Sequence, residues 1–169
     1  MSTISKKRKT QSWADGNASA KRYVESTTDA RKSTKEEDMY MHVDFWHGTD
    51  GVDVKGNNHL DEIWVEFRNV LGKGGWLIGD AKWIAFEICE VGGFVRVERT
   101  ELLDWCLDNV NMELDLVKDN AYRKLYQRLG RKDKIAKLAL HDLQELKTYT
   151  VIPYRTSYIS PRTEETTKI

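Results

Sequence analysis

The sequence predicts a mixed α/β (α+β) fold in which a central mixed β-sheet is flanked by helices. Apolar and polar residues alternate with a period of two in several short segments, among them 42–46, 52–55 and 62–68, as in half-buried strands. Segments 13–25 and 100–110 instead show helical spacing. Strands interrupted by helices in this order favour a sheet with helices packed on it.

Length and composition favour one domain with polar ends. The chain has 169 residues, enough for one sizeable core. We expect a basic tail over residues 1–12, a single domain over 13–154 and a polar tail over 155–169. Basic and acidic residues number 27 each, so nucleic-acid binding must come from local patches. The two cysteines lack metal-type spacing, and no signal peptide or membrane-length apolar run is visible. These features predict a cytoplasmic protein that does not enter a membrane.

The first predicted helix covers residues 13–25, with Asn17 as a candidate N-cap. An acidic run, 36–38, follows a polar loop. It can form the negative first turn of a short helix capped by Ser33 or Thr34. It can also supply a ligand to a nearby metal.

Segment 41–56 carries the chemistry that stands out most. It reads as two short strands joined by a turn at 48–51, with Asp44 on the first strand and Asp53 and Lys55 on the second. Residues two apart in a strand share a face, so Asp53 and Lys55 project together, away from the face that the valines bury. The turn folds the Asp44 strand back beside them. Two carboxylates and one lysine therefore converge.

Such a group suits phosphodiester chemistry. Two carboxylates can hold Mg²⁺, with Mn²⁺ as a substitute, because hard cations prefer oxygen ligands. The cation can activate a water, and Lys55 can orient that water or stabilise developing negative charge. We therefore predict Asp44, Asp53 and Lys55 as catalytic residues and the two aspartates as metal ligands. The alternative is a solvated hairpin with charged outward positions.

An Asp followed nine residues later by Asp-x-Lys resembles the PD-(D/E)XK nuclease superfamily. The stretch 34–84 also resembles small phage-encoded nuclease-like proteins. The proline that often precedes the first Asp is replaced by Val43, so the match is partial. The resemblance implies a restriction-endonuclease-like core and metal-dependent hydrolysis of DNA in a bacterial host cytoplasm, with the three roles on Asp44, Asp53 and Lys55.

Further metal ligands are predicted at Glu37 and Glu66. Glu37 lies shortly before the Asp44 strand, and the acidic run recurs in the proteins that the chain resembles. Glu66 would reach the metal if strand 62–68 pairs beside the Asp53 strand; otherwise it is a cross-strand partner of a basic residue. The resemblance also makes Glu25, on the first helix, a candidate, with a surface glutamate as the alternative.

Two segments are predicted to contact DNA. The glycine-rich segment 71–79 lacks P-loop spacing but offers Lys73 as a charge and Trp76 as a stacking surface. A turn with a buried tryptophan is the alternative. The run 122–132 interleaves basic residues with tyrosines, which suits phosphate contacts, although a solvated charged stretch has the same composition. Its predicted DNA contacts are Arg123, Lys124, Arg128 and Arg131.

The rest of the chain predicts core elements. Segments 82–88 and 93–98 form a β-hairpin, and a helix from Thr100 to 109 or 110 follows. Its buried stripe comprises Leu103, Cys106, Leu107 and Val110. We expect an irregular segment over 111–120, a strand over 134–140, a short helical turn capped by Asp142, and a last strand over 148–154.

The combined prediction is a metal-dependent deoxyribonuclease. One alternative is a non-catalytic nucleic-acid-binding module, which would bind DNA without depending on the carboxylates. Another is a small phage protein that inhibits or redirects a host enzyme through its tryptophans. A homodimer is compatible with the nuclease, because cutting both strands of a duplex often takes two sites.

Overall fold

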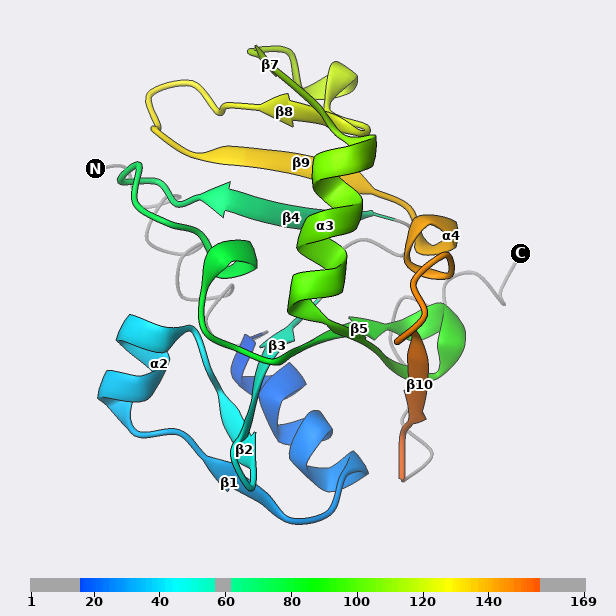
Figure 1. Cartoon of the computed structure of the whole chain (residues 1–169). Helices are drawn as coiled ribbons and strands as arrows, with labels where there is room; N and C mark the ends of the chain where they lie inside the picture. Colours follow the sequence, from blue (N-terminus) through cyan, green and yellow to red (C-terminus); the bar gives the residue numbers. More distant parts are fainter. Residues whose placement is uncertain (1–15, 57–61, 156–169) are drawn as a thin grey trace, which may run out of the picture.

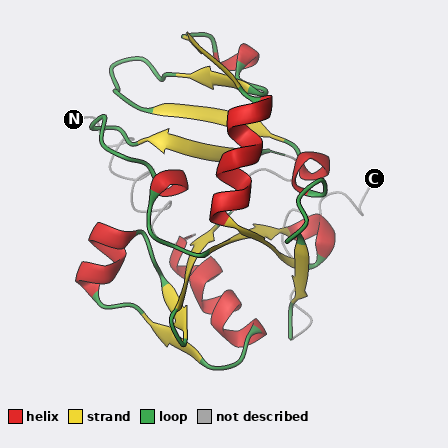
Figure 2. Cartoon of the chain, in the orientation of Figure 1, coloured by secondary structure: helices red, strands yellow, loops and turns green. Residues whose placement is uncertain are grey.

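The structure is a computed structural model that describes residues 16–56 and 62–155, and it confirms a mixed α+β fold (Figures 1 and 2). Two sheets are present, and helices pack against them. A first helix covers residues 16–26 of the described part. The other helical elements are α2 (Lys35–Met41), α3 (Arg99–Asn109), α4 (Leu140–Leu143) and the 3-10 turns η1 (Trp76–Ile78), η2 (Cys89–Val91) and η3 (Lys118–Asn120).

The larger sheet has six strands in the order β1-β2-β3-β5-β6-β10. Only the β3–β5 pair is parallel, and every other neighbouring pair is antiparallel. The sheet therefore contains the predicted hairpins β2–β3 and β5–β6. Its strands are β1 (Ala30–Lys32), β2 (Phe45–His47), β3 (Asp50–Lys55), β5 (Trp83–Ile88), β6 (Gly93–Glu98) and β10 (Thr150–Pro153).

The smaller sheet has four strands in the order β4-β9-β8-β7 and lies above the larger one in Figure 1. Its strands are β4 (Ile63–Arg68), β7 (Asn111–Asp115), β8 (Lys124–Tyr126) and β9 (Lys134–Leu138). Strand β4 pairs with β9 and not with β3, so the condition under which Glu66 would reach the metal is not met. Periodicity marks a strand but does not select its neighbour.

One apolar cluster joins the two sheets. It combines Val65 of β4 and Leu138 of β9 with Phe86 of β5 and Leu102 of α3, and all four are buried. A second cluster lies on the other face of the larger sheet, where Tyr23 of the first helix packs on neighbouring strands. Both faces of the larger sheet are therefore covered, and a charged side chain on its central strands is withdrawn from water.

Several local predictions need correction. Asn17 is itself helical and is not an N-cap. Leu107 is 57% exposed and Leu102 is buried, so the buried stripe of α3 is rotated from the one predicted. Segment 111–120 is not irregular, because it contains β7 and η3. Asp142 lies inside α4, where its carboxylate accepts a hydrogen bond from the Ala139 backbone.

No helix in the two described ranges is long and apolar enough to cross a membrane.

Candidate active site

Asp44, Asp53 and Lys55 converge at the open end of the β2–β3 hairpin, where β2 begins and β3 ends. Asp44 immediately precedes β2, and its Oδ2 accepts a 2.7 Å hydrogen bond from the Val54 backbone N–H. Asp53 is 3% exposed, and its Oδ1 lies 3.1 Å from the Lys55 ammonium. Val52 is buried in the cluster on the opposite face of the sheet. The predicted alternation therefore holds, and it directs both aspartates and the lysine to one place.

Burial and proximity make the two carboxylates difficult to ionise together. Loss of solvent, followed by the charge of Asp53, raises the pKa of Asp44 to about 6. Burial also raises the pKa of Asp53, although the Lys55 ammonium opposes the shift. Two carboxyl groups this close share a proton, because full ionisation would place two like charges in a poorly solvated site. The Lys55 ammonium compensates only one of the two charges of the ionised pair.

One oxygen of this centre accepts no hydrogen bond from an N–H or hydroxyl group of the residues that the structure describes. It is the buried Oδ2 of Asp53, and the other hydrogen bond of this carboxyl group, to Asp44, needs the shared proton. A divalent cation would satisfy that oxygen and neutralise the pair. Within residues 16–56 and 62–155 no group of three His, Cys, Asp or Glu side chains is already arranged to hold a metal. Two carboxylates with waters and substrate phosphate nevertheless suit Mg²⁺, which seldom uses an all-protein cage.

The acidic run on α2 supplies a different residue from the one predicted. Glu37 is the third residue of the helix and forms a capping box with Thr34. It also pairs with Arg31, which lowers the pKa of Glu37 to about 2. Its carboxylate is thereby engaged away from the aspartates. The short-helix interpretation of this run is correct, and the signal was present in the sequence as Thr-x-x-Glu.

Asp38, the next residue, is the acidic side chain that interacts with the centre. Burial raises the pKa of Asp38, and the charge of Asp44 and a hydrogen bond to Asp44 add to the shift. Sequence reasoning chose Glu37 because position along the chain does not reveal which way a side chain leaves the helix. A one-residue step turns the direction by about 100°.

A pocket of about 890 Å³ lies beside these acids, between the first helix and α2. Asp38 and Asp44 line it, and so does Glu25 of the first helix, which is an exposed surface glutamate. Three exposed lysines stand on the same wall. A phosphate backbone approaching the carboxylates would meet these positive charges, which are Lys21, Lys32 and Lys35.

The glycine-rich segment contributes a core tryptophan. Trp76 is 6% exposed and packs edge-on against Phe86, so the turn with a buried tryptophan is what forms. The Lys55 ammonium lies 5.0 Å from the centre of the Trp76 ring, which adds a cation–π contact to the Asp53 ion pair. Through this contact, Trp76 positions Lys55. The other predicted DNA contact of the segment, Lys73, is exposed and has no ion-pair partner among the residues described.

Glu66 lies on the smaller sheet, because β4 pairs with β9. It lines a second pocket with Trp64 and Trp76 instead of standing beside Asp53. The pairing that would bring it to the aspartates does not form.

Most of the basic run is engaged in internal ion pairs. Arg123 contacts the fully buried Asp142, and Lys124 lies 3.2 Å from Asp115. Arg128 pairs through Nε with Asp133 at 2.6 Å. Arg131 is exposed and has no ion-pair partner in the described part of the chain. Most of the basic residues that suggested a DNA contact therefore stabilise the fold through ion pairs within the chain.

Comparisons of this chain with protein-family models, with curated proteins and with solved structures returned no match.

Proposed function

We propose that the protein is a metal-dependent nuclease that hydrolyses DNA phosphodiester bonds at Asp44, Asp53 and Lys55. The observation that carries the proposal is the buried aspartate pair, in which Asp53 Oδ2 accepts no N–H or hydroxyl hydrogen bond from residues 16–56 and 62–155 and a lysine lies 3.1 Å from Oδ1. Isolated buried carboxylates are costly, and they persist where a function uses them. The resemblance to the PD-(D/E)XK superfamily supports the same roles.

Asp44 and Asp53 would hold Mg²⁺ or Mn²⁺. When bound, the cation supplies a Lewis acid that favours ionisation of water and screens charge on the phosphate. The Val54 N–H orients Asp44 at Oδ2, and the hydrogen bonds of Asp44 to Asp38 and Asp53 need a proton that a bound cation would displace. Asp38, at the edge of the pocket, would accept a hydrogen bond from a water of the hydrated site.

Lys55 would stabilise negative charge on the reacting phosphate or orient the attacking water. Its ammonium is held from two sides, by Asp53 Oδ1 and by the Trp76 ring. A group held in this way needs little reorganisation as charge develops, which is how electrostatic catalysis gains most of its rate. The lysines of the adjacent pocket would bind flanking phosphates of the DNA.

The test is cleavage of linear and supercoiled DNA in Mg²⁺, in Mn²⁺ and in EDTA. We expect metal-dependent cutting by the native chain and a loss of about 100-fold or more in Asp53→Asn. The matched control is Asp50→Asn on the same strand, whose carboxylate lies 3.6 Å from Lys82 and outside the centre. It should cut normally.

Lys55→Ala distinguishes metal binding by the aspartates from catalysis by the lysine, because this variant should bind the metal but not cut DNA. Absence of cutting on every substrate, with DNA still bound in EDTA, would identify a binding module instead. Absence of both would leave a protein-interaction role.

A further inference from the structure

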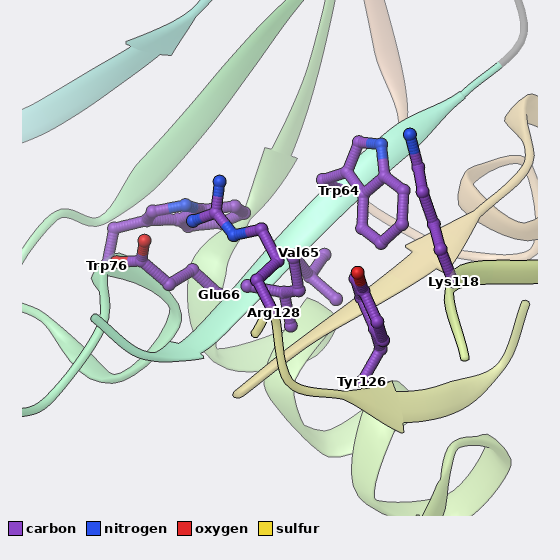
Figure 3. A pocket seen from close by; sticks show the side chains of 8 residues that line it. Trp64, Val65, Glu66, Trp76, Lys118, Tyr126 and Arg128 are labelled. Carbon is purple, nitrogen blue, oxygen red and sulfur yellow. The ribbon is translucent and has the colours of Figure 1, made fainter. Parts of the chain in front are cut away.

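The second pocket has a volume of about 520 Å³ and opens on the smaller sheet (Figure 3). It is separate from the aspartate pair, because neither Asp44 nor Asp53 lines it. Its size lies in the range of small-molecule sites. Strands β4, β8 and β9, the turns η1 and η3, and the segment after β8 all contribute to its wall. The lining residues are Trp64, Val65, Glu66, Trp76, Lys118, Tyr126, Arg128 and Ile135.

Two aromatic rings form one side of this pocket. Trp64 and Tyr126 come from different strands, yet their ring centres are 6.2 Å apart. Neither ring is buried in the core, so both keep accessible surface. Figure 3 shows them facing the same space, with Lys118 beside them. Their planes are tilted by 47°, so a flat ligand can stack on one ring, with the other ring at its side.

One polar group of the pocket lacks a partner. The side chain of Glu66 is partly buried and makes no hydrogen bond or ion pair with any residue that the structure describes. Its backbone is paired with β9 and closely approached by Gly75, where an added Cβ would come within 2.4 Å of the Glu66 carbonyl oxygen. A ligand with N–H donors would supply the partner that this carboxylate lacks.

Two cations complete the pocket. Arg128 is anchored by Asp133 through Nε, which leaves its terminal amino groups for another partner. Lys118 has no ion-pair partner among the described residues. The two positive charges disfavour a cationic ligand, and the rings disfavour a simple anion. A nucleotide has the three features that this pocket requires: an aromatic face, N–H donors at the base edge and a phosphate.

We propose that this pocket binds one nucleotide of a single-stranded nucleic acid. The base stacks on Trp64 with the tilted Tyr126 ring at its side, its amino-bearing edge donates to Glu66, and its phosphate lies near Lys118, while Arg128 stands on the Glu66 side of the rings (Figure 3). Guanine fits best, because it presents two adjacent N–H donors to the two carboxylate oxygens, whereas uracil and thymine lack an amino group. A base within a duplex does not expose its face, so the strand must be unpaired.

This inference rests on the proposed nuclease function, which makes a nucleic acid the expected ligand. It adds that the nucleic-acid substrate contains an unpaired segment. Trp76 connects the two sites, because it lines the pocket while its ring also contacts the Lys55 ammonium. Because Trp76 is buried, it places the pocket next to Lys55 without itself contacting a bound strand.

The experiment uses the full chain carrying Asp53→Asn, in EDTA, so that the result does not depend on metal or cleavage. Titrations with GMP and UMP are followed by calorimetry and by the indole N–H signal of Trp64, assigned with Trp64→Phe. We expect GMP to bind about 10- to 100-fold more tightly than UMP and to shift the Trp64 signal. Glu66→Gln should remove most of this preference, and Lys118→Ala should weaken both nucleotides.

Matched controls are Glu113→Gln and Lys134→Ala, which change exposed residues of the same sheet that do not line the pocket. Both should bind as the parent does. No binding of either nucleotide at about 10 mM would overturn the proposal. Equal affinities in Glu66→Gln and the parent, or shifts that leave Trp64 unmoved, would overturn it as well. Failure of DNA cutting would leave these binding results unaffected, so the two proposals fail separately.

Discussion

Asp53→Asn should stabilise the metal-free protein while it abolishes activity. The substitution keeps the shape of a fully buried side chain and removes one of two repelling charges. In the native chain the pKa of Asp44 is about 6, against 3.8 in an unperturbed aspartate, a shift of about two units. At about 1.4 kcal/mol per unit, ionised Asp44 is destabilising by about 3 kcal/mol, and its burial contributes more of this than the charge of Asp53.

The net gain is smaller, because the Asp53–Lys55 ion pair is lost too and part of the shift in Asp44 comes from its own burial. We expect a gain of about 1–2 kcal/mol at pH 8, or about 2–8 °C in Tm. The gain must depend on pH. Below about pH 4 the carboxyl group is protonated in the folded and the unfolded state, so its raised pKa does not change the free energy of unfolding. As pH rises from about 4 to about 6, the group ionises more readily in the unfolded state, and the free energy of unfolding falls.

The assay is thermal and urea unfolding of both proteins in EDTA from pH 4 to pH 8. The difference in unfolding free energy should be near zero at pH 4 and reach its plateau above pH 6. Asp50→Asn is the matched control, since its exposed pair with Lys82 contributes at most about 1 kcal/mol. An Asp53→Asn protein that melts below the native one at pH 8, or a difference independent of pH, would refute this account of the pair.

Three further changes have distinct expected outcomes. Thr34→Ala removes the side-chain cap of α2 and should cost about 1 kcal/mol in urea unfolding; an unchanged midpoint would show that the cap does not stabilise the helix. Arg123→Ala leaves the carboxylate of Asp142 buried and should cost about 2–4 kcal/mol without changing DNA affinity in a binding titration, whereas weakened binding at unchanged stability would return Arg123 to the interface. Asp38→Asn removes a charge beside Asp44 and should lower the pH of half-maximal Mn²⁺ binding; an unmoved midpoint would exclude Asp38 from the site.

The sequence was sufficient for the central hairpin because its signal is local. Alternation placed Asp53 and Lys55 on one face, and a short turn had to bring Asp44 beside them. Strand β4 was also recognised, but its partner β9 follows about seventy residues later. Pairing over that distance depends on the packing of the whole core, which alternation within one strand does not encode.

The basic residues show the same limit. Arg123 looked like part of a DNA surface because its acidic partner Asp142 is distant in the sequence, whereas the partner of Arg128, Asp133, directly follows the basic run. Asp142 is paired across 19 positions, and it became visible only once β8 and α4 were in place. The capping role of Glu37 could be predicted from the sequence, because its partner Thr34 lies only three positions before it. Pockets such as the one around Trp64 combine segments from several strands and arise only on folding.

The most direct test of the central claim is Mn²⁺ binding to the DNA-free protein, followed by electron paramagnetic resonance of the free ion. The native chain should bind Mn²⁺ with an affinity that rises by about tenfold per pH unit below pH 6 and then levels off, because binding displaces the shared proton. Asp53→Asn should bind at least about tenfold more weakly at pH 7.5. Equal Mn²⁺ affinity in the two proteins, or native binding that does not change between pH 5 and pH 7, would contradict the assignment of Asp44 and Asp53 as the metal site.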